Sequence, residues 1–127
     1  MERQRVSSGS PYETPFGYCR AMRIGDQVLV SGTAPVWPDG SVKSSAYDQA
    51  KRCFEIIETA LKELGASLDD VVRTRMFVTG LSYVDDVGRA HGEAMVRARP
   101  VATMVVVKEL IDLRWHVEIE AEAIISA

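Results

Sequence analysis

The stretch from His116 to Ala123 constrains the fold more than any other segment, because it alternates without exception between apolar and polar side chains. Successive side chains of a β-strand point to opposite faces of the sheet. The apolar set is Val117, Ile119, Ala121 and Ala123. The polar set is His116, Glu118, Glu120 and Glu122. Three carboxylates in one column repel one another, so this face requires solvent, cationic partners or a functional use.

The size and charge of the chain bound the classes of protein to which it can belong. A length of 127 residues, 46% of them hydrophobic, predicts one domain over residues 1–127 with an irregular N-terminal arm over residues 1–15. So short a chain gains buried surface by forming oligomers. The net charge of −3 argues against nucleic acid as a partner, because surfaces that bind nucleic acid are usually basic.

Neither a metal site nor a cofactor is predicted. Cys19 and Cys53 form no Cys-x-x-Cys pair, and no cluster of histidine, cysteine and acidic residues supports a metal. We interpret both thiols as small apolar fillers in a reduced, cytoplasmic protein. The N-terminus lacks the apolar stretch of a signal peptide, and no run approaches the ~20 apolar residues of a membrane span.

Periodicity predicts two helices and five strands. Ser45 is a suitable N-cap for an amphipathic helix that ends at about Leu64, and a second helix runs from Ser82 or Tyr83 to Arg99-Pro100. The predicted strands are Tyr18–Ile24, Gln27–Gly32, Val71–Thr79, Thr103–Val107 and His116–Ile125. This order predicts an α+β domain with a mixed sheet and both helices on one face. The other face is expected to meet a second subunit.

Five local motifs occur in one collinear order over residues 16–125. They are Phe16-Gly17-Tyr18, Val30-Ser31-Gly32-Thr33-Ala34-Pro35, Asp70-Val71-Val72-Arg73-Thr74-Arg75-Met76-Phe77-Val78, Arg99-Pro100-Val101-Ala102-Thr103 and Val117-Glu118-Ile119-Glu120-Ala121. They resemble the Gly-Pro-Tyr, Ser-Gly-Gln-x-Pro, Asp-Val-Val-Lys-Thr-x-Val-Phe-Val, Phe-Pro-Ala-Arg-Ser/Thr and Val-Glu-Ile-Glu-Ala motifs of the RidA/YjgF family, long labelled endoribonuclease L-PSP-like.

The resemblance implies a fold, an assembly and a chemistry. The fold is chorismate-mutase-like, and three subunits form a homotrimer whose sheets line a central barrel and whose interfaces hold small-molecule clefts. Better-known members hydrolyse reactive enamines and imines, such as 2-aminoacrylate, to a keto acid and ammonia. The resemblance implies that Glu118 activates water and that Tyr18, Ser31 and Gly32 complete the pocket.

The fourth motif departs from the family at one position. The resemblance implies that an arginine there binds the substrate carboxylate and that Thr103 lies beside it, but this chain has Ala102. Alanine has no charge and no guanidinium fork to hold a carboxylate. Met104 and Gly88 also replace a family cysteine and asparagine. The chain therefore resembles a branch that lacks the substrate-binding arginine, and standard 2-iminoacid deamination is not expected of it.

Several candidate residues have two interpretations at this stage. Glu118 is either a general acid/base or a strand acid paired with Arg73 or Arg75. Tyr18 either packs against the first strand or orients a ligand with its hydroxyl. Ser31-Gly32 is a strand end or a close backbone approach to a ligand, and no His/Asp pair is placed to make Ser31 a nucleophile.

Three arginines are candidates for the charge that Ala102 does not supply: Arg20, Arg75 and Arg99. The two histidines, His91 and His116, are interpreted as packing or edge residues. Trp37 lies in a proline-flanked loop and either covers the cleft or packs the loop against the first long helix.

The sequence leaves three functions open. The first is a homotrimer that binds a small metabolite and hydrolyses an enamine, imine or related substrate. The second is a non-enzymatic ligand-binding or regulatory protein with the same fold. The third is the endoribonuclease or translation-inhibitor activity in the family's label, against which the net charge of −3 and the absence of a basic stripe argue.

Overall fold

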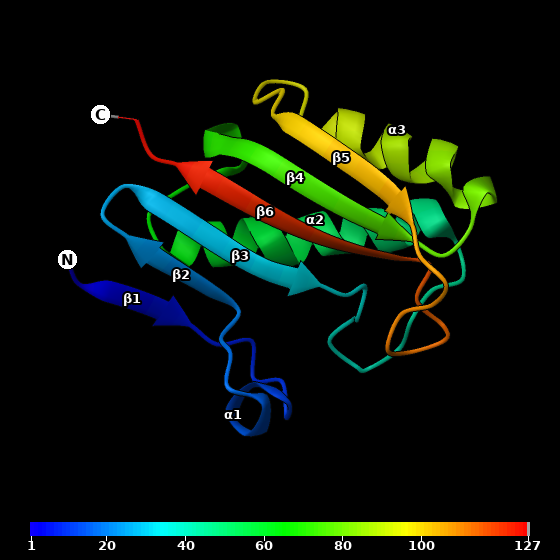
Figure 1. Ribbon diagram of the computed structural model, residues 1–127, viewed down its shortest axis with the longest axis horizontal. Helices are drawn as coiled ribbons and strands as arrows, with labels where there is room; N and C mark the ends of the chain where they lie inside the picture. Colours follow the sequence, from blue (N-terminus) through cyan, green and yellow to red (C-terminus); the bar gives the residue numbers. More distant parts are fainter. Residues whose placement is uncertain (127) are drawn as a thin grey trace.

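The computed structural model describes residues 1–126 as two layers, a six-stranded sheet and two long helices on one of its faces (Figure 1). The strands are β1 Arg3–Val6, β2 Ala21–Ile24, β3 Gln27–Thr33, β4 Val71–Val78, β5 Val101–Val106 and β6 Val117–Ile124. The α-helices are α1 Glu13–Phe16, α2 Ala46–Glu63 and α3 Val84–Ala94, and the short 3-10 helices are η1 Leu68–Asp70 and η2 Leu81–Tyr83. The predicted α+β class, with a mixed sheet and helices on one face, is confirmed.

The sheet has the strand order β1-β2-β3-β6-β4-β5, so the last strand of the chain lies in the interior of the sheet. β4 and β5 are parallel, and the other neighbouring pairs are antiparallel. A parallel pair needs a crossover connection, which α3 provides between β4 and β5. β5 is consequently an edge strand, at the opposite end of the sheet from β1 (Figure 1).

The alternation predicted for the last strand is confirmed. The apolar column of β6 is buried under the helices, with exposed fractions of 0–3% at Val117, Ile119, Ala121 and Ala123. The helix face that meets it consists mainly of buried residues of α2: Ala50, Cys53, Phe54, Ile57 and Leu61. The carboxylates of β6 therefore lie on the face of the sheet that no helix covers.

The first long helix begins and ends as predicted. The Ser45 side chain accepts a hydrogen bond from the backbone N–H of Asp48 at 3.2 Å, which satisfies one of the free amides at the start of α2. Gly65, just beyond the helix, has a φ of 81°, a left-handed conformation that glycine adopts without strain. The helices among residues 1–126 lack the length and apolar character needed to cross a bilayer.

Three predicted boundaries are wrong. The arm over residues 1–15 is not irregular, because Arg3–Val6 pairs with β2 as an edge strand that lacks an apolar alternation. The predicted strand over Tyr18–Ile24 begins only at Ala21, since the preceding residues bond to the arm. The second helix ends at Ala94 and not at Arg99-Pro100, and two i→i−4 turns follow it: Met95 N–H to His91 and Arg99 N–H to Met95.

Candidate functional site

Four of the predicted site residues come together where β3 meets β6. We call Arg20, Ser31, Gly32 and Glu118 the Glu118 cluster. Arg20 immediately precedes β2, Ser31 and Gly32 lie on β3, and Glu118 lies on β6. These residues come from three separate segments of the chain, and the antiparallel pairing of β2, β3 and β6 brings the segments together.

Gly32 makes room for the Glu118 carboxylate. A Cβ at position 32 would lie 2.6 Å from Glu118 Oε2, closer than carbon and oxygen can approach. The pairing register between β3 and β6 shifts between Val30 and Thr33, as at a β-bulge, and Gly32 lies within this interruption. The glycine therefore makes room for a side chain of the neighbouring strand and does not serve a turn of its own backbone.

Arg20 and Ser31 hold the backbone of the cluster in place. Arg20 Nη2 donates a hydrogen bond to the Gly32 carbonyl at 2.7 Å, and the Ser31 N–H donates to the Arg20 carbonyl at 2.9 Å. The Ser31 hydroxyl donates to the Cys19 carbonyl at 2.7 Å, so its proton is engaged in a hydrogen bond that holds the backbone. Arg20 Nε is buried and has no partner among residues 1–126, so one donor of the cluster is unsatisfied within this part of the chain.

Burial raises the pKa of the Glu118 carboxyl above its usual range, because the charged form loses solvation. The Arg20 guanidinium opposes this shift, and Glu120 adds to it by repulsion. A carboxyl group whose pKa is displaced toward neutrality can both accept and return a proton near physiological pH. This property distinguishes Glu118 from an ordinary strand acid.

The other two acids of the β6 column are ion-paired. Arg75 Nη1 lies 2.9 Å from Glu120 and 3.3 Å from Glu122, and Arg73 Nε lies 3.8 Å from Glu122. The alternative that paired Glu118 with Arg73 or Arg75 is wrong, since both arginines face the acids farther along the strand. Arg75 is likewise not free to replace the charge missing at Ala102.

Tyr18 lies just before the Glu118 cluster in the chain. It follows α1, its N–H donates to the Glu13 carbonyl at 3.0 Å, and its side chain is 40% exposed. The neighbouring Cys19 carbonyl accepts the Ser31 hydroxyl, which anchors this segment to β3. The exposed ring is free to meet a ligand or another chain.

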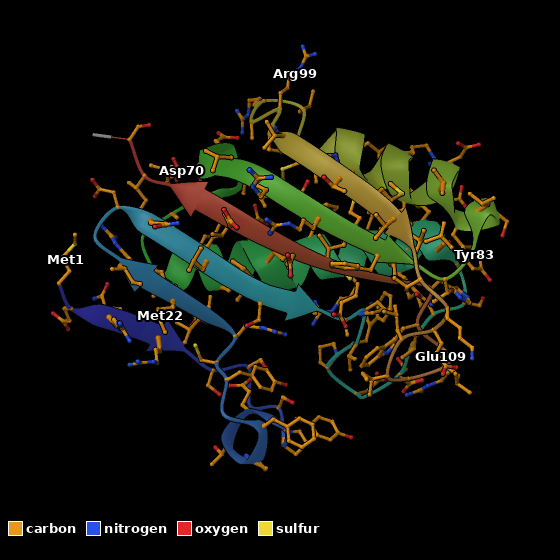
Figure 2. The ribbon with its side chains drawn as sticks, in the orientation of Figure 1. Met1, Met22, Asp70, Tyr83, Arg99 and Glu109 are labelled. Atoms are coloured by element: carbon orange, nitrogen blue, oxygen red, sulfur yellow. The ribbon has the colours of Figure 1, made fainter. Side chains whose placement is uncertain are left out.

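The predicted residues of the fourth motif lie elsewhere. Ala102 and Thr103 are on β5, opposite Thr74 and Arg75 of β4, so their side chains point to opposite faces of the sheet. Arg99 precedes this strand, and its side chain extends away from the body of the molecule (Figure 2).

Within one chain the two halves of the predicted site do not meet. Glu118 pairs with Phe77, three residues from Thr74 along β4, and β4 lies between β6 and β5. Strand spacing and rise per residue put the Cα atoms of Glu118 and Ala102 on the order of 14 Å apart. A substrate as small as 2-aminoacrylate cannot contact both positions in the same chain.

The sequence predicts that His91 is a packing or edge residue, and the structure adds a polar contact that the sequence does not predict. Its Nε2 lies 2.8 Å from the Thr74 hydroxyl, and its ring meets Phe54 edge-on at 5.7 Å between centroids. Thr74 is fully buried and pairs with Ala102 across β4 and β5. No sequence signal could have found this arrangement, because it depends on which strand lies beneath α3.

The second histidine is a packing residue, as predicted. His116 stacks on Tyr83 at 4.2 Å between centroids, and its N–H donates to the buried Gln49 side chain at 2.7 Å. The loop that carries Trp37 is fastened to α2 by Arg52, whose Nε donates to the Val36 carbonyl at 2.9 Å. Among residues 1–126, no three His, Cys, Asp or Glu side chains gather closely enough to hold a metal ion.

Comparison with known proteins gives consistent matches over nearly the whole chain. The family model described as endoribonuclease L-PSP matches residues 11–125. The chain is 41% identical to the uncharacterized protein SCO2049 of Streptomyces coelicolor over 121 residues, which cover 94% of this chain and 90% of that protein. It is 33% identical to the RutC family protein PYRAB12510 of Pyrococcus abyssi, with 87% of each chain covered.

The fold also matches a solved structure of high similarity. The crystal structure of Rv2704 from Mycobacterium tuberculosis, a member of the YjgF/YER057c/UK114 family, superposes with a TM-score of 0.89 and 43% sequence identity. The match covers 98% of this chain and 100% of that one. The architecture in Figure 1 is therefore shared with a relative over its full length.

Proposed function

Since the chain belongs to the endoribonuclease L-PSP family, also called the YjgF or RidA family, we propose that it hydrolyses a small enamine or imine in clefts between the subunits of a homotrimer. The observation that carries this proposal is the Glu118 cluster, in which burial raises the pKa of a carboxyl group next to an unpartnered Arg20 donor. A relative provisionally named the reactive intermediate deaminase TdcF of Escherichia coli, 28% identical over 115 residues, supports this class of chemistry.

The proposed reaction uses Glu118 twice. An enamine first tautomerises to the imine, and the Glu118 carboxylate then takes a proton from water as the water oxygen bonds to the imine carbon. The resulting carboxylic acid returns its proton to the nitrogen, which gives a neutral carbinolamine. Glu118 then carries the hydroxyl proton to the same nitrogen, the C–N bond breaks as the C=O bond forms, and a carbonyl compound and ammonia leave. The Tyr18 ring is available to pack against the substrate, and a water that enters the cluster would satisfy the buried Arg20 Nε.

A second copy of the chain is part of this proposal because the site is incomplete without it. The Glu118 cluster and Ala102 are too far apart to bind one small molecule within a chain. The sheet face that bears Glu118 also exposes apolar side chains, namely Leu29, Val101, Val105 and Ile124. Covering that face with a neighbouring subunit would bury these side chains, and the edge strand β5 of that subunit would bring Ala102 to the rim of the Glu118 cluster.

The substrate is proposed to carry less negative charge than 2-aminoacrylate. Ala102 occupies the position at which the family resemblance implies a carboxylate-binding arginine. A carboxylate placed beside an alanine would lose solvation without gaining a bidentate partner.

The first test restores the missing arginine. We expect unsubstituted protein to hydrolyse 2-aminoacrylate weakly, and Ala102→Arg to raise kcat/KM by at least about tenfold, the effect of one charge-assisted hydrogen bond of 1.5 kcal/mol or more. Ammonia release from 2-aminoacrylate generated in the cuvette measures both proteins. Fast turnover by the unsubstituted protein, with no gain in the variant, would show that Ala102 does not limit this chemistry.

A second test uses Gly32 to displace the carboxylate without removing it. Gly32→Ala would place a Cβ 2.6 Å from Glu118 Oε2, so the flexible end of Glu118 must move. We expect turnover to fall by about 10²-fold, the usual consequence of misplacing a reacting group by 1 Å. Gly80→Ala is the matched control, because a Cβ there meets its nearest atoms at an ordinary 3.6 Å. Equal activity in the two variants would show that Glu118 takes no part in the reaction.

The two alternative functions predict different results. A non-enzymatic ligand-binding protein would bind small carbonyl compounds and release no ammonia from any imine tested, whereas Glu118→Ala would change its ligand affinity. An endoribonuclease would cleave RNA after rigorous repurification and lose this cleavage in Glu118→Ala.

A further inference from the structure

The hydrogen-bonded pair of His91 and Thr74 lies at the position where the family resemblance implies a cation. Thr74 and Ala102 are direct neighbours on β4 and β5, and residues so paired have Cβ atoms about 5 Å apart. Thr74, Met76 and Val78 occupy alternate positions of β4 and are all buried under the helices. The Thr74 side chain and that of its neighbour Ala102 therefore point toward the helices. The His91 ring on α3 reaches Thr74 from above, at 2.8 Å between Nε2 and Oγ1.

The imidazole of His91 is uncharged at neutral pH. Burial lowers its pKa below the usual value, and the groups that contact the ring carry no charge to oppose this shift. These groups are the Thr74 hydroxyl from β4 and the Phe54 ring from α2. A neutral imidazole presents one donor and one acceptor, and Thr74 uses only Nε2. The Nδ1 atom remains for a ligand.

A groove extends from this pair along α3. It has a volume of about 460 Å³ and is lined by His91, Gly92, Met95, Val96, Arg99 and Pro100. Pro100 immediately precedes β5 and lies two residues before Ala102. The groove therefore ends close to the start of β5, and its walls are about equally polar and apolar.

The candidate cations are all engaged or directed elsewhere. Arg75 pairs with Glu120 and Glu122 on the opposite face of the sheet. Arg20 donates to the Gly32 carbonyl in the Glu118 cluster. Arg99 lies at the rim of the groove, and Figure 2 shows its side chain extended away from the molecule.

We propose that His91, oriented by its hydrogen bond to the buried Thr74, determines substrate specificity, and that its imidazole binds an uncharged polar group, such as a carboxamide or ketone oxygen, near the position where the family resemblance implies an arginine that binds a carboxylate. The ligand class is a small neutral carbonyl or imine compound whose apolar part lies over Met95, Val96 and Pro100. This inference rests on the proposed function, because it names the substrate class of that site.

The test compares two probes of equal shape and different charge. Unsubstituted full-length protein is titrated with 2-oxobutanamide and with 2-oxobutanoate, and amide chemical shifts of Gly92 and Val96 report binding in the groove. We expect the neutral carboxamide to bind at least tenfold more tightly than the carboxylate. Equal affinity, or tighter binding of 2-oxobutanoate, overturns the inference.

A double variant tests the role of His91 without leaving a buried hydroxyl unpaired. His91→Leu combined with Thr74→Val removes both partners of the hydrogen bond, which is expected to change stability little. We expect this variant to lose at least tenfold in affinity for 2-oxobutanamide and to lose the preference for the neutral probe. His116→Leu is the matched control, because His116 stacks on Tyr83 outside the groove. Retained affinity in the double variant contradicts the proposal.

This experiment distinguishes failure of the specificity inference from failure of the proposed hydrolysis. The preference between probes is measured without any reaction, so it stands or falls independently of ammonia release. Active protein with no preference would refute the specificity inference and keep the proposed function. A clear preference in a protein that releases no ammonia from any imine would keep the neutral-ligand site and refute the hydrolysis.

Discussion

Replacing Glu118 by glutamine is expected to lower kcat by about 10²-fold or more, the usual contribution of a general acid/base, while the protein becomes more stable. Glutamine keeps the shape of the side chain and removes its proton transfer. Unsubstituted protein should also show kcat/KM rising with pH through the raised pKa of Glu118, and the variant should show no such rise. Ammonia release over a range of pH measures both effects.

The stability change has a definite sign. The folded-state pKa of Glu118 lies above the value of 4.5 that applies when the chain is unfolded, so folding favours the protonated group. That contribution is present below pH 4.5 and is lost as pH rises through the folded-state pKa. Glutamine resembles the protonated form. At pH 7 we expect the variant to melt about 2–5 °C above the unsubstituted protein, and near pH 4 the difference should shrink.

Glu120→Gln is the matched control for this experiment. It lies two residues away on the same face of β6, but its carboxylate is 2.9 Å from Arg75 Nη1. Its loss is expected to lower stability by about 0.5 kcal/mol, the value of a partly exposed ion pair, and to change turnover far less than Glu118→Gln does. If both variants lost activity and stability alike, Glu118 would be only a structural acid.

Val105→Asp is expected to separate the subunits. Val105 is 42% exposed, lies on the edge strand β5, and pairs with Phe77 on the face that carries Glu118. If three chains of 14.0 kDa cover this face with one another, an aspartate there is desolvated without a partner, and association should weaken by about 10²-fold or more. Sedimentation equilibrium at micromolar concentration should show trimers before the substitution and smaller species after it.

Thr59→Asp is the control for the interface variant. Thr59 is also β-branched and exposed, but it lies on the outer face of α2, away from the sheet. We expect it to leave the assembly intact. A well-folded monomer of the unsubstituted protein at micromolar concentration would contradict the proposed trimer, and loss of activity together with assembly in Val105→Asp would support a site shared between chains.

The fold was predictable because its strongest signals are local. The alternation on β6, the Ser45 cap and the apolar stripe of α2 each follow from neighbouring residues, and all three are confirmed. The N-terminal strand Arg3–Val6 was missed for the opposite reason. It is a polar edge strand held by backbone pairing with β2, and such pairing leaves no pattern in the side chains.

The candidate site was predictable only in part. The sequence by itself determined the strand pattern, the column of acids and the alanine at position 102, because each depends on the order of residues alone. Only the tertiary structure decided that Glu118 lies against Gly32 while Glu120 and Glu122 meet arginines, and that His91 contacts Thr74, the strand neighbour of Ala102. The physical reason is that burial and partners depend on strand register and on helix placement, which bring together residues distant in the chain.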